Sequence, residues 1–197
     1  MTIGIGALAS GGGSNFEALV RAGSPGAEFR RLVVDKPGAG ALDRARRLGV
    51  EALVIEPKAF SDRAAFYDRL ADEMEKRVVR LICLAGFLLK VEPNFLRRFP
   101  GRVLNIHPAL LPKFGGKGLW GHRVHEAVLA AGEKESGCTV HVVDEEFDHG
   151  PILAQARVPV LPGDTAETLA ARVLEQEHKI FPETVREVIR KMGEFKP

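Results

Sequence analysis

Short apolar runs alternate with amphipathic segments along the first half of the chain. Five of these runs have the length and residue types of strands: residues 2–8, 29–34, 51–56, 78–87 and 103–107. The segments between them carry apolar residues at helical spacing and begin near Ser14, at residue 40, near Ser61 and at residue 93. Strands that alternate with helices predict right-handed βαβ units and a mostly parallel sheet.

Local signals refine two of these elements. Residues 78–87 are the most apolar run, which is typical of a central parallel strand. Phe66, Leu70 and Met74 recur every four residues and predict the buried face of a helix. Ser61 is the expected N-cap of that helix.

The pattern changes in the last third of the chain. Residues 137–145 and 151–160 are strand-like and joined by a short turn, so we expect them to pair as an antiparallel hairpin. A closing helix is expected from Thr165 to about Met192, with an interruption at Pro182. The predicted fold is α/β: a Rossmann-like, mostly parallel sheet flanked by helices, with a C-terminal antiparallel β-hairpin extension and a closing helix.

Composition excludes several classes of function. The 197 residues include 27% charged and 45% hydrophobic positions, and the net charge of +2 gives no reason to expect nucleic-acid binding. No apolar run reaches the roughly 18–20 residues of a membrane helix, and the N-terminus lacks the pattern of a signal peptide. Cys83 and Cys138 lie inside strand-like segments and are expected to be reduced core thiols, which favours a cytoplasmic protein.

A glycine-rich loop, Ser10–Asn15, lies between the first predicted strand and the first predicted helix. Glycines let the backbone approach an anion closely, and a helix N-terminus presents free N–H groups with a favourable dipole. The spacing fits neither the dinucleotide motif nor the nucleoside-triphosphate motif. The loop therefore favours a single phosphate, with a flexible turn and an N-cap as the alternative.

Asn105 and His107 interrupt the apolar pattern of the fifth predicted strand. Side chains alternate along a strand, so these two share one face, and Pro108 ends the strand behind them. Ligands of open α/β sheets bind at the carboxyl ends of the strands. The pair therefore predicts a functional site. In the alternative, neighbouring loop backbone satisfies both side chains.

Four carboxylates lie between Asp144 and Asp148, in the turn of the predicted hairpin. Such a cluster usually forms a solvated turn, and its spacing does not match a calcium-binding EF-hand loop. Asp148 differs, because the following turn, residues 149–151, would hold it in place. The six histidines show no zinc-ligand spacing, and His141, between two valines of a strand, is expected to be structural.

Taken in order, these sites resemble those of the phosphoribosylglycinamide formyltransferases, the folate-dependent glycinamide ribonucleotide transformylases of purine synthesis. The resemblance covers nearly the whole chain and rests on SGGGSN, LAGFLLKVEP, GRVLNIHPALLPKF, HEAVLAAGEKESGCTVHVVDEEFDHGPILAQARVPV and EQEHKIFP. It implies that residues 1–197 form a single formyltransferase domain. Residues 1–100 would be its phosphate- and ribonucleotide-binding half, and residues 101–197 its catalytic and folate-binding half.

The resemblance also implies roles for individual residues. The expected catalytic residues are Asn105, His107 and Asp148. The expected contacts with the ribonucleotide are Gly12, Gly13, Ser14, Asn15 and Glu177. The expected folate pocket comprises Arg63, Leu88, Leu89, Lys90, Val91, Asn105, Asp144, Glu145, Glu146, Phe147 and Asp148.

The implied reaction transfers the formyl group of 10-formyltetrahydrofolate to the amine of glycinamide ribonucleotide. Asn105 and a protonated His107 would stabilise the oxyanion of a tetrahedral intermediate. Asp148 would raise the pKa of His107 and assist proton transfer. The expected partners are the ribonucleotide and the reduced folate, without metal, nucleic acid or membrane, in a cytoplasmic monomer or homodimer.

Two other functions stay open. A formyltetrahydrofolate deformylase would use the same three residues to admit water, although such relatives usually carry an extra N-terminal domain. A non-catalytic module would only bind a folate or a phosphoribosyl group. The segment GGKGLWGHRVH is longer than the compact loop expected in the family. Its Lys117, Trp120 and His122 form either a surface lid or a cover over the substrate.

Overall fold

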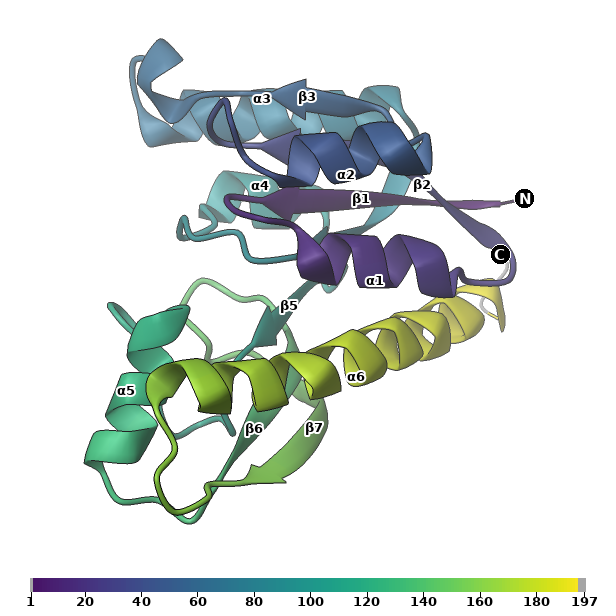
Figure 1. Ribbon diagram of the computed structural model, residues 1–197. Helices are drawn as coiled ribbons and strands as arrows, with labels where there is room; N and C mark the ends of the chain where they lie inside the picture. Colours follow the sequence, from purple (N-terminus) through teal and green to yellow (C-terminus); the bar gives the residue numbers. More distant parts are fainter. Residues whose placement is uncertain (1, 195–197) are drawn as a thin grey trace.

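A computed structural model, which describes residues 2–194, shows a seven-stranded sheet in the order β3-β2-β1-β4-β5-β6-β7 (Figure 1). The parallel strands are β1 (Ile3–Ala9), β2 (Ala27–Val34), β3 (Ala52–Val54), β4 (Val79–Leu84) and β5 (Val103–His107). The antiparallel strands, which extend the sheet beyond β5, are β6 (Glu135–Val142) and β7 (Ile152–Pro159). The predicted mostly parallel sheet with an antiparallel C-terminal hairpin is confirmed, and its most apolar strand, β4, is the middle one.

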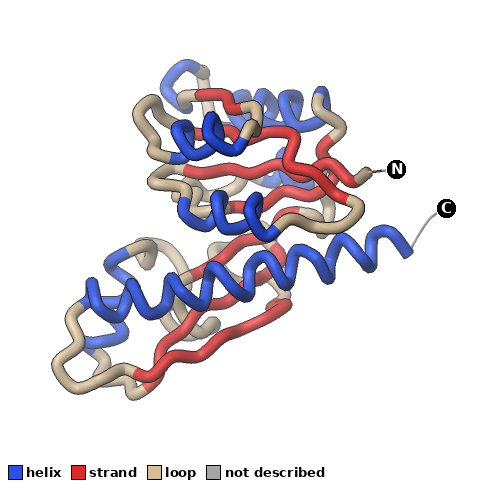
Figure 2. The backbone as a smooth tube through the Cα atoms, turned by 45° about the vertical axis from the view of Figure 1, so that its right-hand side comes forward, coloured by secondary structure: helices blue, strands red, loops and turns tan. Residues whose placement is uncertain are grey.

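Helices cover both faces of the sheet. One face carries α1 (Ser14–Ala22), α2 (Ala41–Leu48) and α6 (Ala166–Glu194). The other carries α3 (Arg63–Lys76) and α4 (Pro93–Arg98), preceded by a short 3-10 turn, η1 (Pro57–Ala59). The remaining helix, α5 (His122–Ala130), packs beside α6. Figure 2 shows α6 running along the antiparallel strands and ending beside α1.

Two hydrophobic cores result from the alternation of side chains along the strands. In β1, Ala7 faces the core beneath α1, α2 and α6, whereas its neighbour Leu8 faces the core beneath α3 and α4. Phe66, Leu70 and Met74 of α3 are fully buried in the second core, as their four-residue spacing predicts. The sheet is therefore covered on both faces, and its strand ends are left for a site.

Helix α6 is continuous through Pro182, so the predicted interruption there is wrong. A proline in a helix interior costs about 3 kcal/mol, because it removes a hydrogen bond and crowds the preceding turn. Burial of one large apolar side chain contributes about 1.5–3 kcal/mol. Helix α6 buries several such side chains on both sides of the proline: Leu169, Val173, Phe181, Val185 and Ile189. This packing outweighs the local preference.

The connection between β6 and β7 is longer than the predicted short turn. Strand β6 ends at Val142 and β7 begins at Ile152, so residues 143–151 form a loop. This loop carries the carboxylate cluster that includes Asp148. The loop starts beside the first residues of β5 and folds back, so that Asp148 reaches His107 at the carboxyl end of that strand.

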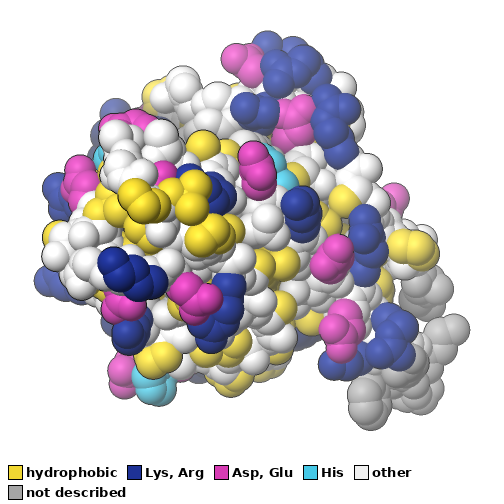
Figure 3. Space-filling view, turned by 60° about the horizontal axis from the view of Figure 1, so that its bottom comes forward, with side chains coloured by type: hydrophobic (Ala, Val, Ile, Leu, Met, Phe, Trp, Pro, Cys, Tyr) yellow, Lys and Arg dark blue, Asp and Glu magenta, His cyan; other side chains and the backbone are white. Residues whose placement is uncertain are grey.

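Both cysteines are buried, as their strand-like segments predict, and surface side chains of both charges are mixed. Cys83 and Cys138 are free and buried, and burial raises the pKa of both thiols. On the face seen in Figure 3, Lys and Arg side chains lie among Asp and Glu side chains and do not form one patch. Within residues 2–194, no helix combines the length and apolar character needed to cross a membrane.

The N-cap of α3 is Asp62, and the prediction of Ser61 is wrong by one residue. Asp62 has extended backbone angles, and its Oδ1 accepts a hydrogen bond of 2.8 Å from the Ala65 N–H. Ser61 instead donates its hydroxyl to Asp62 Oδ2 at 3.2 Å. A carboxylate at this position also interacts favourably with the helix dipole.

Asp62→Ala should therefore lower the free energy of unfolding by about 1 kcal/mol, because an N–H group of the first turn loses its acceptor. The matched control is Ser61→Ala, which leaves the cap in place and should change stability much less. Urea unfolding followed by circular dichroism measures both. A larger loss in Ser61→Ala than in Asp62→Ala would contradict the assignment of the cap.

Candidate active site

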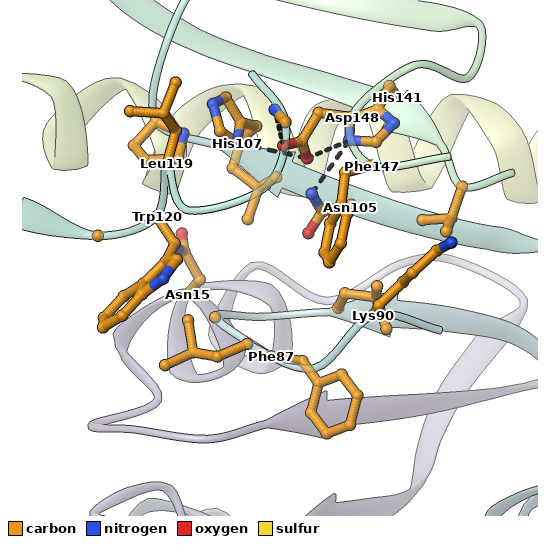
Figure 4. Close-up of a pocket in the computed structure, with 18 of the residues that line it drawn as sticks. Asn15, Phe87, Lys90, Asn105, His107, Leu119, Trp120, His141, Phe147 and Asp148 are labelled. Atoms are coloured by element: carbon orange, nitrogen blue, oxygen red, sulfur yellow. Dashed lines mark hydrogen bonds and ion pairs between the residues drawn. The ribbon is translucent and has the colours of Figure 1, made fainter. Parts of the chain in front are cut away.

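A cavity of about 650 Å³ opens at the carboxyl ends of the parallel strands (Figure 4). Its size lies within the usual range for small-molecule sites. Most of its wall residues come from the segment after β4, strand β5, the loop before α5, the β6–β7 loop and helix α6. Asn15 of α1 adds a polar group. The cavity therefore joins both halves of the chain.

The glycine loop bends sharply between β1 and α1. Gly13 has φ 78°, and a Cβ built there would lie 2.6 Å from the Ala41 Cβ, so only glycine fits. Arg44 holds the loop from the side, because its Nε donates to the Gly12 carbonyl at 2.7 Å. Asn15 lines the cavity, whereas Gly12, Gly13 and Ser14 lie in the loop and first turn that carry it, outside the cavity lining.

Asn15 and Glu177, which are far apart in sequence, meet at the cavity wall. Asn15 Nδ2 donates to Glu177 Oε2 at 2.6 Å. Burial raises the pKa of Glu177, and the hydrogen bond from Asn15 offsets only part of this effect. Asn15 Oδ1 is buried and has no hydrogen-bond partner among residues 2–194. The pair therefore presents a free amide oxygen and a carboxyl group of raised proton affinity.

A second polar group of the cavity lies at the carboxyl end of β5. It consists of Asn105, His107 and Asp148. Strand alternation directs Asn105 and His107 to the cavity, and the β6–β7 loop brings Asp148 to them. His107 Nδ1 lies 3.5 Å from Asp148 Oδ1. His107 Nε2 donates to the Phe114 carbonyl at 2.8 Å, and the Gly116 N–H donates to Asp148 Oδ2 at 3.0 Å.

Burial controls the charge state of this group. It lowers the pKa of His107, and the opposing effects of Asp148 and the Phe114 carbonyl do not cancel it. Asp148 does favour the protonated ring, as expected, but the net shift is downward. Burial also acts to raise the pKa of Asp148, yet His141, His107 and the Gly116 N–H together lower it below its usual value. The resting pair at neutral pH is therefore a carboxylate beside a neutral imidazole.

The hydrogen bonds fix the tautomer of that imidazole. A carbonyl oxygen only accepts, so His107 carries its proton on Nε2, facing Phe114. The Nδ1 lone pair then faces the Asp148 carboxylate. Two acceptors that face each other without a proton between them form a site that binds one. The geometry is therefore suited to take a proton from a ligand inside the cavity.

His141, expected to be structural, also lines the cavity. Its Nδ1 lies 3.0 Å from the Val142 carbonyl and so carries the proton, which leaves Nε2 to accept from Asn105 Nδ2 at 3.0 Å. His141 Nε2 is also 3.6 Å from Asp148 Oδ1. The signal for this role is the strand register, because Asn105 and His141 are direct partners across β5 and β6.

The residues expected to form the folate pocket fall into two groups. Most line the cavity: Leu88, Leu89, Lys90, Val91, Asn105, Asp144, Glu146, Phe147 and Asp148. Arg63 and Glu145 do not. Arg63 lies behind the wall, where it donates to the Lys90 carbonyl at 2.6 Å and pairs with Glu92 at 2.7 Å. Arg63 therefore stabilises the segment after β4 from outside the cavity lining.

The loop before α5, for which the sequence left a surface lid or a substrate cover open, forms another wall of the cavity. Gly116 to His122 line the cavity, and Trp120 is half-exposed with the Arg123 guanidinium 5.1 Å from its ring centroid. His122 Nε2 pairs with Glu167 Oε1 at 3.0 Å, which ties the loop to α6. His125 is a cavity residue with no specific signal in the sequence; its burial, with minor effects of His122 and His107, lowers its pKa to about 4.

No cluster of three or more His, Cys, Asp or Glu side chains in the described part of the chain has a geometry suited to a metal ion. The polar groups of the cavity are instead amide, imidazole and carboxylate groups that hydrogen-bond to one another or to backbone. Such groups can bind a polar ligand and transfer protons, and they surround a partly apolar cavity.

Comparison with known proteins gives consistent results. Residues 5–185 match the Formyl transferase family. The chain is 45% identical over 181 residues to the chloroplastic phosphoribosylglycinamide formyltransferase of Arabidopsis thaliana, covering 89% of this chain but only 62% of that relative. It is 37% identical over 185 residues to the phosphoribosylglycinamide formyltransferase of Bacillus subtilis, covering 92% of each.

A solved structure agrees with the sequence relatives. The crystal structure of glycinamide ribonucleotide transformylase 1 from Symbiobacterium toebii superposes with a TM-score of 0.89 at 44% identity, over 94% of this chain and 86% of that one. Family match, identity and fold thus extend over the strands and loops that build the cavity. The chain belongs to the formyl transferase family, among the phosphoribosylglycinamide formyltransferases.

Proposed function

We propose that this protein transfers the formyl group of 10-formyltetrahydrofolate to the amine of glycinamide ribonucleotide, giving formylglycinamide ribonucleotide and tetrahydrofolate in purine synthesis. The observation that carries the proposal is the acceptor pair of His107 and Asp148, which lies beside Asn105 in the cavity of a formyl transferase family member. Attack by an amine on a formyl carbon releases a proton and creates an oxyanion, and this site offers a group for each.

The cavity walls fit a reduced folate. The segment after β4 contributes apolar side chains, of which Leu88 is exposed toward solvent, and Phe147 on the β6–β7 loop is exposed as well. Lys90 Nζ lies 5.8 Å from the Phe147 ring centroid, so a cation borders this apolar wall. A flat, partly polar ring needs apolar faces and a few hydrogen-bonding groups at its edges. The cavity-lining side chains of segments 88–91 and 143–148 supply both.

The opposite end of the cavity fits the ribonucleotide. Asn15 and Glu177 provide an amide and a carboxyl group for the glycinamide. The glycine loop before α1 provides the helix N-terminus expected to hold the phosphate. Because Asn15 and Leu88 come from residues 1–100, and the catalytic candidates from residues 101–197, we treat the chain as a single formyltransferase domain.

In the proposed mechanism, His107 Nδ1 accepts a proton from the attacking amine. The new imidazolium is held between the Phe114 carbonyl and the Asp148 carboxylate, so its positive charge is stabilised next to the developing oxyanion. His107 later returns the proton to the folate nitrogen that leaves. This order differs from the expectation of a histidine protonated from the start, because burial keeps the resting ring neutral.

Asn105 has the complementary task of hydrogen bonding to the oxyanion. One amide hydrogen is directed to His141 Nε2, which fixes the plane of the amide. The second amide hydrogen stays available for the formyl oxygen. Removal of one preorganised donor of this kind typically lowers the rate on the order of 10²–10³-fold.

The test of function is amine dependence. Purified protein with 10-formyltetrahydrofolate should release tetrahydrofolate only when glycinamide ribonucleotide is present, which the absorbance change of the folate measures. Release that is independent of the ribonucleotide would instead identify a deformylase. Binding of either ligand without any release would identify a non-catalytic module.

Asp148→Asn should lower kcat on the order of 10²–10⁴-fold, because the amide keeps the shape of the side chain but cannot stabilise the imidazolium. KM values should change far less. The control is Glu145→Gln, which makes the same chemical change in the same loop outside the cavity lining and should leave kcat near wild type. Equal kcat values in the two variants would contradict the role of Asp148.

Activity should fall on the acid side of neutrality. The pKa of His107 lies below its ordinary value of 6.5, so kcat/KM should be steady near neutral pH and decline below about pH 6.5, as the pair takes up a proton. His149→Ala is the control, since that exposed histidine pairs with Asp144 and its loss should leave the acid limb in place. A kcat/KM that rises as pH is lowered would show that the protonated ring is the active form.

A further inference from the structure

We propose that the backbone of residues 114–116, here called the strap, is a positioning element for the reaction. One strap carbonyl orients His107, and one strap N–H orients Asp148. This inference rests on the proposed function and deepens it. It assigns the orientation of both catalytic candidates to main-chain groups of a loop that carries no catalytic side chain.

The strap contacts the outer atom of each catalytic candidate. The Phe114 carbonyl accepts from His107 Nε2 at 2.8 Å, and the Gly116 N–H donates to Asp148 Oδ2 at 3.0 Å. The inner atoms, His107 Nδ1 and Asp148 Oδ1, are thereby turned toward each other at 3.5 Å. In Figure 4, dashed lines join Asp148 both to His107 and to the loop.

Each strap contact selects one of two orientations of the side chain that it binds. An imidazole that rotates by half a turn exchanges the sides of its ring, and a neutral ring can carry its proton on either nitrogen. The Phe114 carbonyl removes this freedom, because only an N–H group can face it. A carboxylate can likewise rotate, and the Gly116 N–H holds one oxygen of Asp148 so that the other faces His107.

The strap is held against the sheet at its base. The Leu111 N–H donates to Thr139 Oγ1 at 3.1 Å, and Gln155 Nε2 donates to the Leu111 carbonyl at 2.9 Å. Strands β6 and β7 therefore anchor the chain just before the strap. Close packing adds to this, since a Cβ built at Gly115 would lie 3.1 Å from the Asp148 Cβ.

Two glycines provide a matched comparison, one in the strap and one outside the cavity lining. Gly116 and Gly163 have φ values of 100° and 81°, which residues with a Cβ rarely adopt, and a Cβ built at either position meets no atom within 4 Å. A substitution by alanine therefore strains the backbone in both cases without a steric clash. The difference is that the Gly116 N–H binds Asp148.

Gly116→Ala should lower kcat on the order of 10- to 100-fold, with small changes in both KM values, because misplaced reacting groups slow the chemical step more than binding. Gly163→Ala should stay close to wild type. The carboxyl carbon signal of Asp148, followed by NMR as pH is varied, should titrate at higher pH in Gly116→Ala than in wild type or Gly163→Ala. The reason is that the carboxylate loses a donor, while His107 of β5 and His141 of β6 still face it.

Amide hydrogen exchange tests the strap even where Gly116→Ala does not fold. The Gly116 N–H should be protected in wild type, and Asp148→Ala should remove that protection. Failure of the proposed function would appear as absent tetrahydrofolate release in wild type, whereas exchange and the Asp148 titration still report on the strap. Equal kcat and Asp148 titration in the two glycine variants, or an unprotected Gly116 N–H in wild type, would overturn the proposal.

Discussion

The antiparallel pairing of β5 with β6 is the constraint that assembles the site. Its register sets Asn105 opposite His141 and His107 opposite Thr139. The first pair fixes the amide of Asn105, and Thr139 bonds the chain at Ala109 and Leu111 that leads away from β5. The same pairing starts the β6–β7 loop beside the first residues of β5, and the loop folds back so that Asp148 reaches His107.

Burial gives these polar groups their chemistry and also makes their partners necessary. A buried polar group without a partner costs about 1–3 kcal/mol, so each of these side chains needs at least one hydrogen-bond partner. His107 Nε2 has the Phe114 carbonyl, Asp148 has the Gly116 N–H, and Asn105 has His141. The same desolvation lowers the proton affinity of the resting histidine. Burial therefore makes the hydrogen bonds of the site necessary and also keeps the resting His107 ring neutral.

Local patterns in the sequence carried much of the fold and part of the site. The shared face of Asn105 and His107 follows from strand alternation alone, because period two depends only on neighbours. His141 was missed, since its contact depends on the register between two strands, which is not a local property. The prediction at Pro182 failed because tertiary burial outweighed a local preference, and the prediction at Ser61 failed because Asp62 is an equally good cap and has the required geometry. The predicted role of Asp148 rests on family resemblance, because no spacing rule links it to β5.

The bond between Asn15 and Glu177 joins positions 162 residues apart, across nearly the full length of the described chain. The strands and helices of the N-terminal half contact mostly one another, so they can form early as the chain emerges from the ribosome. The cavity cannot form early, because Asn15 in its wall bonds to Glu177 on α6, the last helix of the chain. Contacts of such long sequence separation carry a large loop-closure entropy and slow folding. The binding site is therefore complete only when α6 packs against α1.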